Sequence, residues 1–145
     1  MTKPNELTAT IEFARKLQGH VGPYLVIGLK MGAAAKTALN ISDTESTHLR
    51  AEIAVPLYPP FSCLLDGIQV STTCTVGNQR LSIKNAKSIE ATFTKENSST
   101  IIKIKLAKGF SEELEQLHLQ NQLDEEHGWE IAGLPENKLF TIKIE

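Results

Sequence analysis

The chain has 145 residues, of which 41% are hydrophobic and 22% are charged, and its formal net charge is −2. This length suits one globular domain over residues 1–145 and leaves little for a second. The lysines of the second half are interrupted by acidic residues and form no basic stripe, so we expect no nucleic-acid partner.

The start of the chain predicts a helix over residues 5–17, because Leu7, Ile11 and Ala14 fall on one face at helical spacing. The residues before it are polar, and no cationic segment precedes a short apolar core there, so we expect no signal peptide. We therefore expect a cytoplasmic protein, in which the two cysteines stay reduced.

The most apolar part of the chain predicts a second helix over residues 23–39. Pro23 suits the first turn of a helix, where a missing N–H costs nothing. The segment is nearly long enough to span a membrane, but it contains Lys30 and Lys36. We therefore predict a helix buried in the core and no membrane partner.

The middle of the chain predicts a half-buried strand over residues 48–55, where apolar and polar residues alternate. The prolines of residues 56–60 then force an extended loop. Ser62 is suited to cap a short helix over residues 63–71.

The second half predicts three strands, a helix and a last strand: residues 81–83, 88–94 and 99–106, a helix from Ser111, and residues 139–144. A turn over residues 95–98 would join two of these strands as a hairpin. The whole order predicts an α+β fold with a mostly antiparallel sheet packed against helices.

Three polar segments do not fit a simple core, and the first is Gln18-Gly19-His20-Val21-Gly22-Pro23-Tyr24. A histidine between two glycines, just before a helix, can turn its ring into a cleft. Taken alone, the segment favours a turn histidine with a satisfied hydrogen bond, because a metal or catalytic role needs partners.

The second segment is Pro60-Phe61-Ser62-Cys63-Leu64-Leu65-Asp66-Gly67-Ile68-Gln69. If Cys63 begins a helix, the helix dipole lowers its thiol pKa. Asp66 follows one turn later on the same side, where it can share a cation with Cys63 or orient a histidine. The alternative is a buried cysteine that acts as a small hydrophobic residue.

The third segment is Ser71-Thr72-Thr73-Cys74-Thr75-Val76-Gly77, in which hydroxyl residues flank Cys74. Cys74 follows Cys63 by 11 positions, which is too far for a zinc knuckle. One imidazole and two thiolates suit zinc or another late transition metal. Three protein ligands with an open fourth position are typical of catalytic rather than structural sites.

These segments, in this order, resemble the motifs of the FmdE-like family, which takes its name from formylmethanofuran dehydrogenase, over roughly residues 12–83. The first is followed here by Gly28-Leu29-Lys30-Met31-Gly32, which matches the family's pattern after its first motif. The resemblance implies an α+β core that is often dimeric, so we expect a homodimer with a small-molecule ligand.

The resemblance also implies a cleft site. It assigns His20, Cys63 and Cys74 as ligands of zinc, or of iron or nickel instead. Asp66 and Cys63 become the catalytic candidates, and the candidates for binding a cofactor are Gln18, Tyr24 and Gln69.

The chain departs from the family pattern at three positions. Gln18 stands in place of the first histidine, Thr73 in place of a glycine, and Asn78 in place of a lysine. No cysteine follows Cys74, so we do not expect the C-terminal zinc finger that many relatives carry.

Four functions stay open at this point. The first is a metal-dependent enzyme or enzyme subunit acting on a small molecule, in which the metal activates water or polarises the substrate. The others are a non-catalytic module that binds or delivers a metal or cofactor, a thiol-redox protein using Cys63 and Cys74, and a purely structural site. The three departures shift weight from the first to the second.

Overall fold

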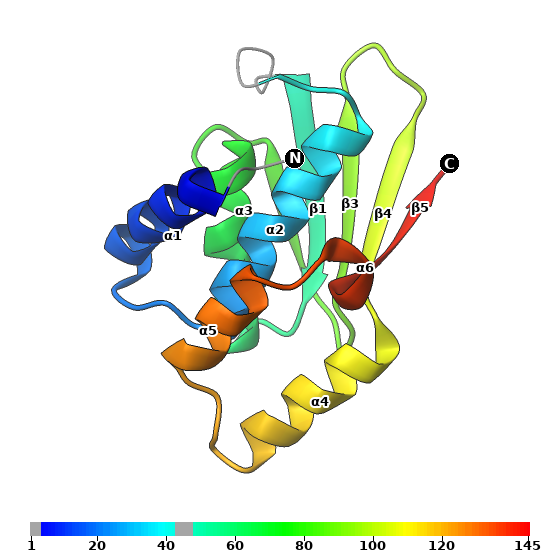
Figure 1. The fold of residues 1–145 in the computed structure, drawn as a ribbon. Coiled ribbons are helices and arrows are strands. Elements are labelled where there is room, and N and C mark those ends of the chain that lie inside the picture. The colour runs from blue at the N-terminus through cyan, green and yellow to red at the C-terminus, as the bar shows by residue number, and fades with distance from the viewer. Residues whose placement is uncertain (1–3, 43–47) are drawn as a thin grey trace.

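The structure is a computed structural model that describes residues 4–42 and 48–145. Figure 1 shows its helices and strands. The helices are α1 (Pro4–Gln18), α2 (Pro23–Ala38), η2 (Phe61–Cys63, a 3-10 helix), α3 (Leu64–Thr72), α4 (Lys108–Leu119), α5 (Glu125–Ala132) and α6 (Glu136–Leu139). The strands are β1 (Leu49–Val55), β2 (Leu81–Asn85), β3 (Glu90–Lys95), β4 (Ile101–Leu106) and β5 (Phe140–Ile144).

The five strands form one sheet in the order β2-β1-β3-β4-β5. β1 runs parallel to β2, and the other neighbours pair antiparallel. The predicted α+β fold with a mostly antiparallel sheet is therefore confirmed. The parallel pair arises because α3 and its flanking loops carry the chain from the end of β1 back to the start of β2, and parallel neighbours require such a crossover.

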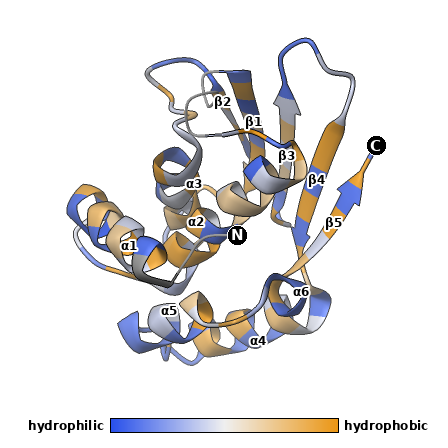
Figure 2. Ribbon diagram, turned by 45° about the horizontal axis from the view of Figure 1, so that its top comes forward, coloured by the Kyte–Doolittle hydropathy of each residue, from blue (hydrophilic) through white to orange (hydrophobic). Residues whose placement is uncertain are grey.

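One face of the sheet carries the core, as the alternation in β1 predicted. Leu49 and Ile53 are buried, whereas Arg50 and Glu52 are exposed. Helices α2 and α3 cover the buried face, while the other face carries mostly polar side chains (Figure 1). In Figure 2, hydrophobic and hydrophilic residues alternate along α1 and α4, as expected for helices that lie on a core with one side in water.

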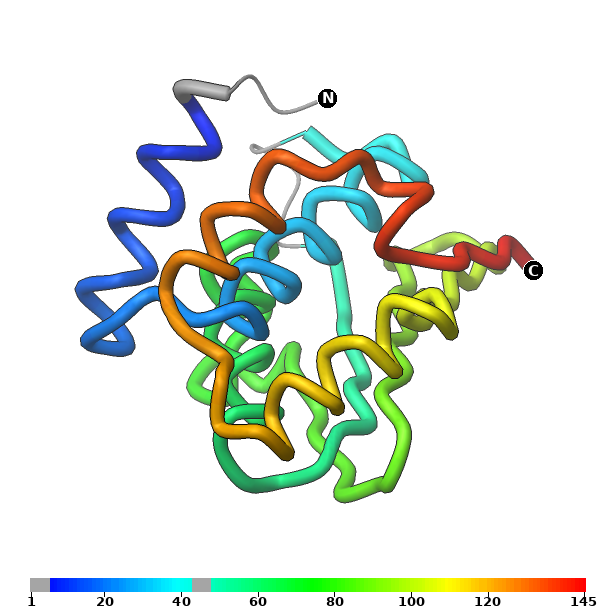
Figure 3. Tube along the Cα trace, turned by 60° about the horizontal axis from the view of Figure 1, so that its bottom comes forward, coloured from blue at the N-terminus to red at the C-terminus, as the bar shows by residue number. Residues whose placement is uncertain are grey.

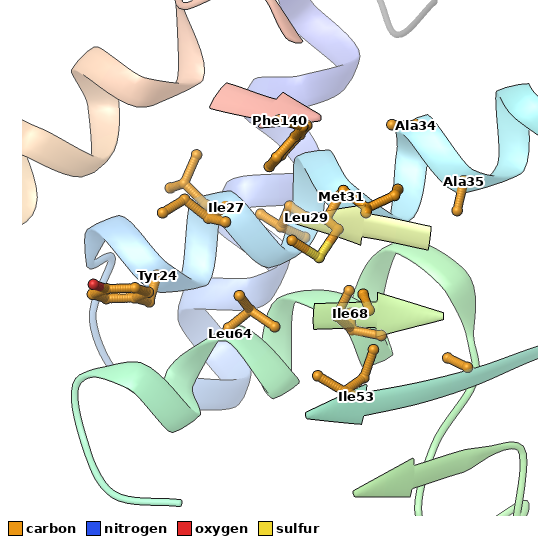
Figure 4. Close-up of a cluster of buried hydrophobic side chains, with 14 of the residues drawn as sticks. Tyr24, Ile27, Leu29, Met31, Ala34, Ala35, Ile53, Leu64, Ile68 and Phe140 are labelled. Carbon is orange, nitrogen blue, oxygen red and sulfur yellow. The ribbon is translucent and has the colours of Figure 1, made fainter. Parts of the chain in front are cut away.

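The centre of the fold is α2, which is buried almost all round, as predicted. Figure 4 shows side chains of four elements meeting around it: Tyr24, Ile27, Leu29 and Met31 of α2, Leu64 and Ile68 of α3, Ile53 of β1, and Phe140 of β5. Gly28 and Gly67 let α2 and α3 approach closely, since a Cβ on Gly28 would lie 3.0 Å from the carbonyl carbon of Leu64. The start of α3 is thus held firmly against α2.

The sequence patterns did not predict α5, which packs on α2. Asp124 caps it, accepting a hydrogen bond from the His127 N–H at 3.1 Å. Arg15 of α1 forms a two-pronged ion pair with Glu125, at 2.9 and 3.1 Å, and ties α1 to α5. Across residues 4–42 and 48–145, no helix has both the length and the apolar character needed to span a membrane.

Candidate functional site

Cys63 lies at the end of η2, just before α3, and is partly buried. Burial, and then the negative charge of Asp66, raise the pKa of its thiol, and a hydrogen bond with Gln18 opposes them only in part. The expected lowering of this pKa by the helix dipole is therefore wrong: desolvation and a neighbouring carboxylate outweigh the dipole. The thiol stays protonated at neutral pH.

Asp66 lies one turn further along α3 and binds Gln69. The Gln69 amide donates to Asp66 Oδ1 at 3.3 Å, and its carbonyl oxygen accepts from the Val76 N–H at 3.4 Å. Burial raises the pKa of the Asp66 carboxyl. Gln18, Cys63, Asp66 and Gln69 therefore meet at the start of α3, and we call them the Cys63 cluster.

One atom of this cluster stands out. Gln18 Oε1 is buried and has no hydrogen-bond partner among the residues that the structure describes. A buried acceptor without a donor costs free energy. The cluster is therefore suited to receive a cation or a donor group.

Cys74 lies at the opposite end of α3. It is fully buried, and its thiol donates a hydrogen bond to the Leu49 carbonyl oxygen at 3.3 Å. The nine residues of α3 separate it from Cys63, which at the rise of an α-helix is about 14 Å. Zinc–sulfur bonds of about 2.3 Å and disulfide Cα separations below about 7 Å are both far shorter.

His20 lies in the exposed loop between α1 and α2. No three His, Cys, Asp or Glu side chains within residues 4–42 and 48–145 form a group that could hold a metal ion. The structure therefore does not bring His20, Cys63 and Cys74 together, and these residues do not fit a three-ligand metal site as they are arranged. The set stays a prediction.

Tyr24 faces a different place, a cleft of about 490 Å³ that the sequence patterns did not predict. Figure 3 shows the elements around it, with α4 crossing in front of the loop after β1. The lining side chains come from α2, the loop after β1, η2, the β2–β3 connection, the end of β4 and α4: Tyr24, Pro56, Tyr58, Phe61, Lys87, Ser88, Ile89, Glu90, Lys105, Leu106, Lys108, Ser111, Glu112 and Glu115.

One wall of the cleft is aromatic. The ring of Phe61 packs edge-to-face with Tyr24, at 5.1 Å, and with Tyr58, at 5.3 Å. Tyr24 is buried, whereas Tyr58 is 57% exposed and offers a ring face. Burial, and then the charge of Glu115, raise the pKa of Tyr24, so its hydroxyl stays protonated and can donate a hydrogen bond.

The charges that line the cleft balance. Lysines stand at positions 87, 105 and 108, and glutamates at positions 90, 112 and 115. One pair is satisfied internally, because Lys105 Nζ lies 3.2 Å from Glu90 Oε2. A cleft with this lining does not favour a strongly anionic ligand such as a triphosphate.

The sequence profile of the FmdE family (FmdE, molybdenum formylmethanofuran dehydrogenase operon) matches residues 17–141. The match takes in both the Cys63 cluster and the residues that line the cleft.

Two individual proteins are similar to the chain. A protein of Archaeoglobus fulgidus named "Probable S-adenosyl-L-methionine-binding protein" is 24% identical over 163 aligned residues, which are 97% of this chain and 44% of that protein. The chain thus spans less than half of this relative's length. A crystal structure of an FmdE-like protein of tungsten formylmethanofuran dehydrogenase, from Syntrophus aciditrophicus, has a TM-score of 0.63 at 15% identity, covering 96% of this chain and 71% of that one. It shows the same fold.

Proposed function

Since this chain belongs to the FmdE family, as its three motifs predicted, we propose that it is a domain that binds a small organic molecule in the cleft beside α4. The observation that carries the proposal is the cleft itself. Its volume of about 490 Å³ lies in the range of small-molecule sites, roughly 300–1,000 Å³. Its aromatic wall is held in place by Phe61 before any ligand arrives.

Two further observations support this proposal. Tyr24, in the cleft wall, belongs to the first family motif, and Phe61 lies two residues before Cys63 of the second. The name of the A. fulgidus relative refers to S-adenosyl-L-methionine. This compound has a planar ring and a cationic sulfur, which suit aromatic side chains, so it is the first probe to test.

Filling the cleft is expected to abolish ligand binding. Ser111 lines the cleft on α4, and a tryptophan there would occupy much of its volume. We expect S-adenosyl-L-methionine to bind the unchanged protein and Ser111→Trp to weaken binding at least about 10-fold, measured by isothermal titration calorimetry. The matched control is Ser99→Trp, at an exposed position of the β3–β4 turn, away from the strand ends that line the cleft.

A wider panel keeps this test decisive. If S-adenosyl-L-methionine does not bind, thermal shift of the same three proteins is measured with adenosine compounds, amino acids and aromatic acids. The proposal is wrong if no compound stabilises the unchanged protein more than Ser111→Trp. It is also wrong if the ligand that binds is indifferent to both substitutions.

We propose metal binding at the Cys63 cluster as a second candidate. The observation in its favour is the buried Gln18 Oε1, which lacks a donor within the described residues. Cys63 and Asp66 stand beside it, and a thiolate with a carboxylate and an amide oxygen suits zinc, with iron or nickel as alternatives. A bound metal would displace the thiol proton, because cysteine ligates as the thiolate.

This candidate predicts that the two cysteines differ. Untagged protein from metal-rich growth is expected to lose its metal in Cys63→Ser and to keep it in Cys74→Ser, measured by elemental mass spectrometry. The second variant is the matched control, because Cys74 lies at the far end of α3. Equal loss in both variants would restore the set of His20, Cys63 and Cys74, and absence of metal from the unchanged protein would remove the candidate.

A further inference from the structure

We infer that the ligand of the cleft is a dipolar molecule, an aromatic ring that carries both a cationic and an anionic group. The cationic group faces Glu112 and Glu115 of α4. The anionic group faces Lys87 and Lys108. This inference rests on the proposed function and adds the chemical class of the ligand.

The acidic side of the cleft has unused charge. Glu112 and Glu115 both line it, and in the part of the chain that the structure describes neither carboxylate forms a hydrogen bond or an ion pair. The charge of Glu115 reaches the buried Tyr24, whose pKa it helps to raise. A cation placed here would meet two carboxylates and the faces of neighbouring aromatic rings.

The basic side also has unused charge. Of the three lysines in the lining, Lys105 is paired with Glu90 at 3.2 Å. Lys87, in the β2–β3 connection, and Lys108, at the start of α4, have no such partner among the described residues. Two free lysines are enough for one carboxylate, and the balanced lining argues against a polyanion.

The aromatic wall joins the two charged sides. Tyr58 is 57% exposed, and the edge of Phe61 holds its ring at 5.3 Å. A planar ring can stack on the free face of Tyr58 while Pro56 and Leu106 cover apolar surface around it. Ring, cation and anion are thus each matched by a different part of the lining.

Three indole compounds separate these contributions. L-Tryptophan carries both charges, tryptamine only the cation, and 3-indolepropionate only the anion, on the same ring. Titrations followed by amide chemical shifts of the unchanged protein detect millimolar binding. We expect L-tryptophan to bind most tightly, with peaks of α4 and the β2–β3 connection shifting.

Two substitutions then assign the charges to residues. Glu115→Gln is expected to weaken L-tryptophan and tryptamine about 3- to 10-fold and to leave 3-indolepropionate unchanged. Lys108→Met is expected to weaken L-tryptophan and 3-indolepropionate by the same factor and to leave tryptamine unchanged. The matched control is Lys84→Met, an exposed lysine on β2 outside the cleft lining.

The outcomes separate the inference from the proposed function. If the three compounds bind alike, or if neither substitution alters their ranking, the inference fails, while loss of binding in Ser111→Trp still supports the cleft as a site. If none of the three binds at millimolar concentration, the inference fails as well. The proposed function fails with it only if the wider panel also finds no ligand that Ser111→Trp excludes.

Discussion

Replacing Gly67 by alanine is expected to destabilise the protein by about 3 kcal/mol, as overpacking of a tight contact does. A Cβ at this position would lie 2.6 Å from the backbone nitrogen of Leu29 and closer still to the carbonyl oxygen of Leu25. Both atoms belong to the backbone of α2, so no side chain can turn aside to make room. The two helices must move apart, and the core around them loses contacts.

Thermal unfolding measures this effect. For a domain of this size, about 3 kcal/mol lowers Tm by roughly 10 °C. The matched control is Gly109→Ala in α4, where an added Cβ meets no atom within 4 Å and helix propensity favours alanine by up to about 1 kcal/mol. Equal melting temperatures for the two variants would contradict the close packing of α2 on α3.

The same substitution bears on the site. Asp66 is the neighbour of Gly67, and Gln69 follows two residues later, so a shift of α3 displaces the Cys63 cluster as a unit. We expect Gly67→Ala to lower any metal content of the cluster even where the protein remains folded.

Much of the fold follows from local sequence patterns. The alternation in residues 48–55 predicted β1 because one face of that strand is buried and the other is in water. The apolar second helix was predicted to be buried, and Gly28 lies where α3 contacts it. Local patterns missed α5, since only Gly128 and Ile131 of its eight residues are buried and its stability depends on the cap at Asp124 and on contacts with α2.

The candidate site was harder to predict, for two different reasons. The motifs drew Cys63 and Cys74 into one site, although the helix predicted between them already implied that they lie at its opposite ends. The cleft is assembled from side chains as far apart in sequence as Tyr24 and Glu115. No spacing rule links such residues, and the one local signal was the run of prolines and aromatic residues before Cys63.

Replacing Lys30 by methionine is expected to cost roughly 2 kcal/mol, the sum of lost charged hydrogen bonds less a recovered desolvation cost. Lys30 lies in the family motif Gly28-Leu29-Lys30-Met31-Gly32, yet it does not reach the candidate site. Its ammonium donates to the carbonyl oxygens of Ile131 and Ala132, at 3.1 Å each, and to that of Leu134. These carbonyls end α5, where the helix dipole also favours a cation.

Two opposing effects decide the result. Burial lowers the pKa of Lys30, and the nearby Glu136 opposes it, so the folded protein holds this charge less readily than the unfolded chain. Methionine removes that desolvation cost and keeps the apolar stem. It leaves three carbonyl groups without their donor, however, each at a cost of about 1 kcal/mol or more, and this second effect is the larger.

The pH dependence of stability isolates the charge. Between the lowered folded pKa and the unfolded value of about 10.4, the unfolded chain binds more protons, so the lysine makes the free energy of unfolding rise with pH. Urea unfolding at pH 8 and pH 10 should show this contribution in the unchanged protein and in Lys16→Met, an exposed control on α1, and show its loss in Lys30→Met. If Lys30→Met unfolds at the same urea concentration as Lys16→Met at both pH values, the lysine does not hold the end of α5, and its place in the motif must be explained by something other than the packing of α5 on α2.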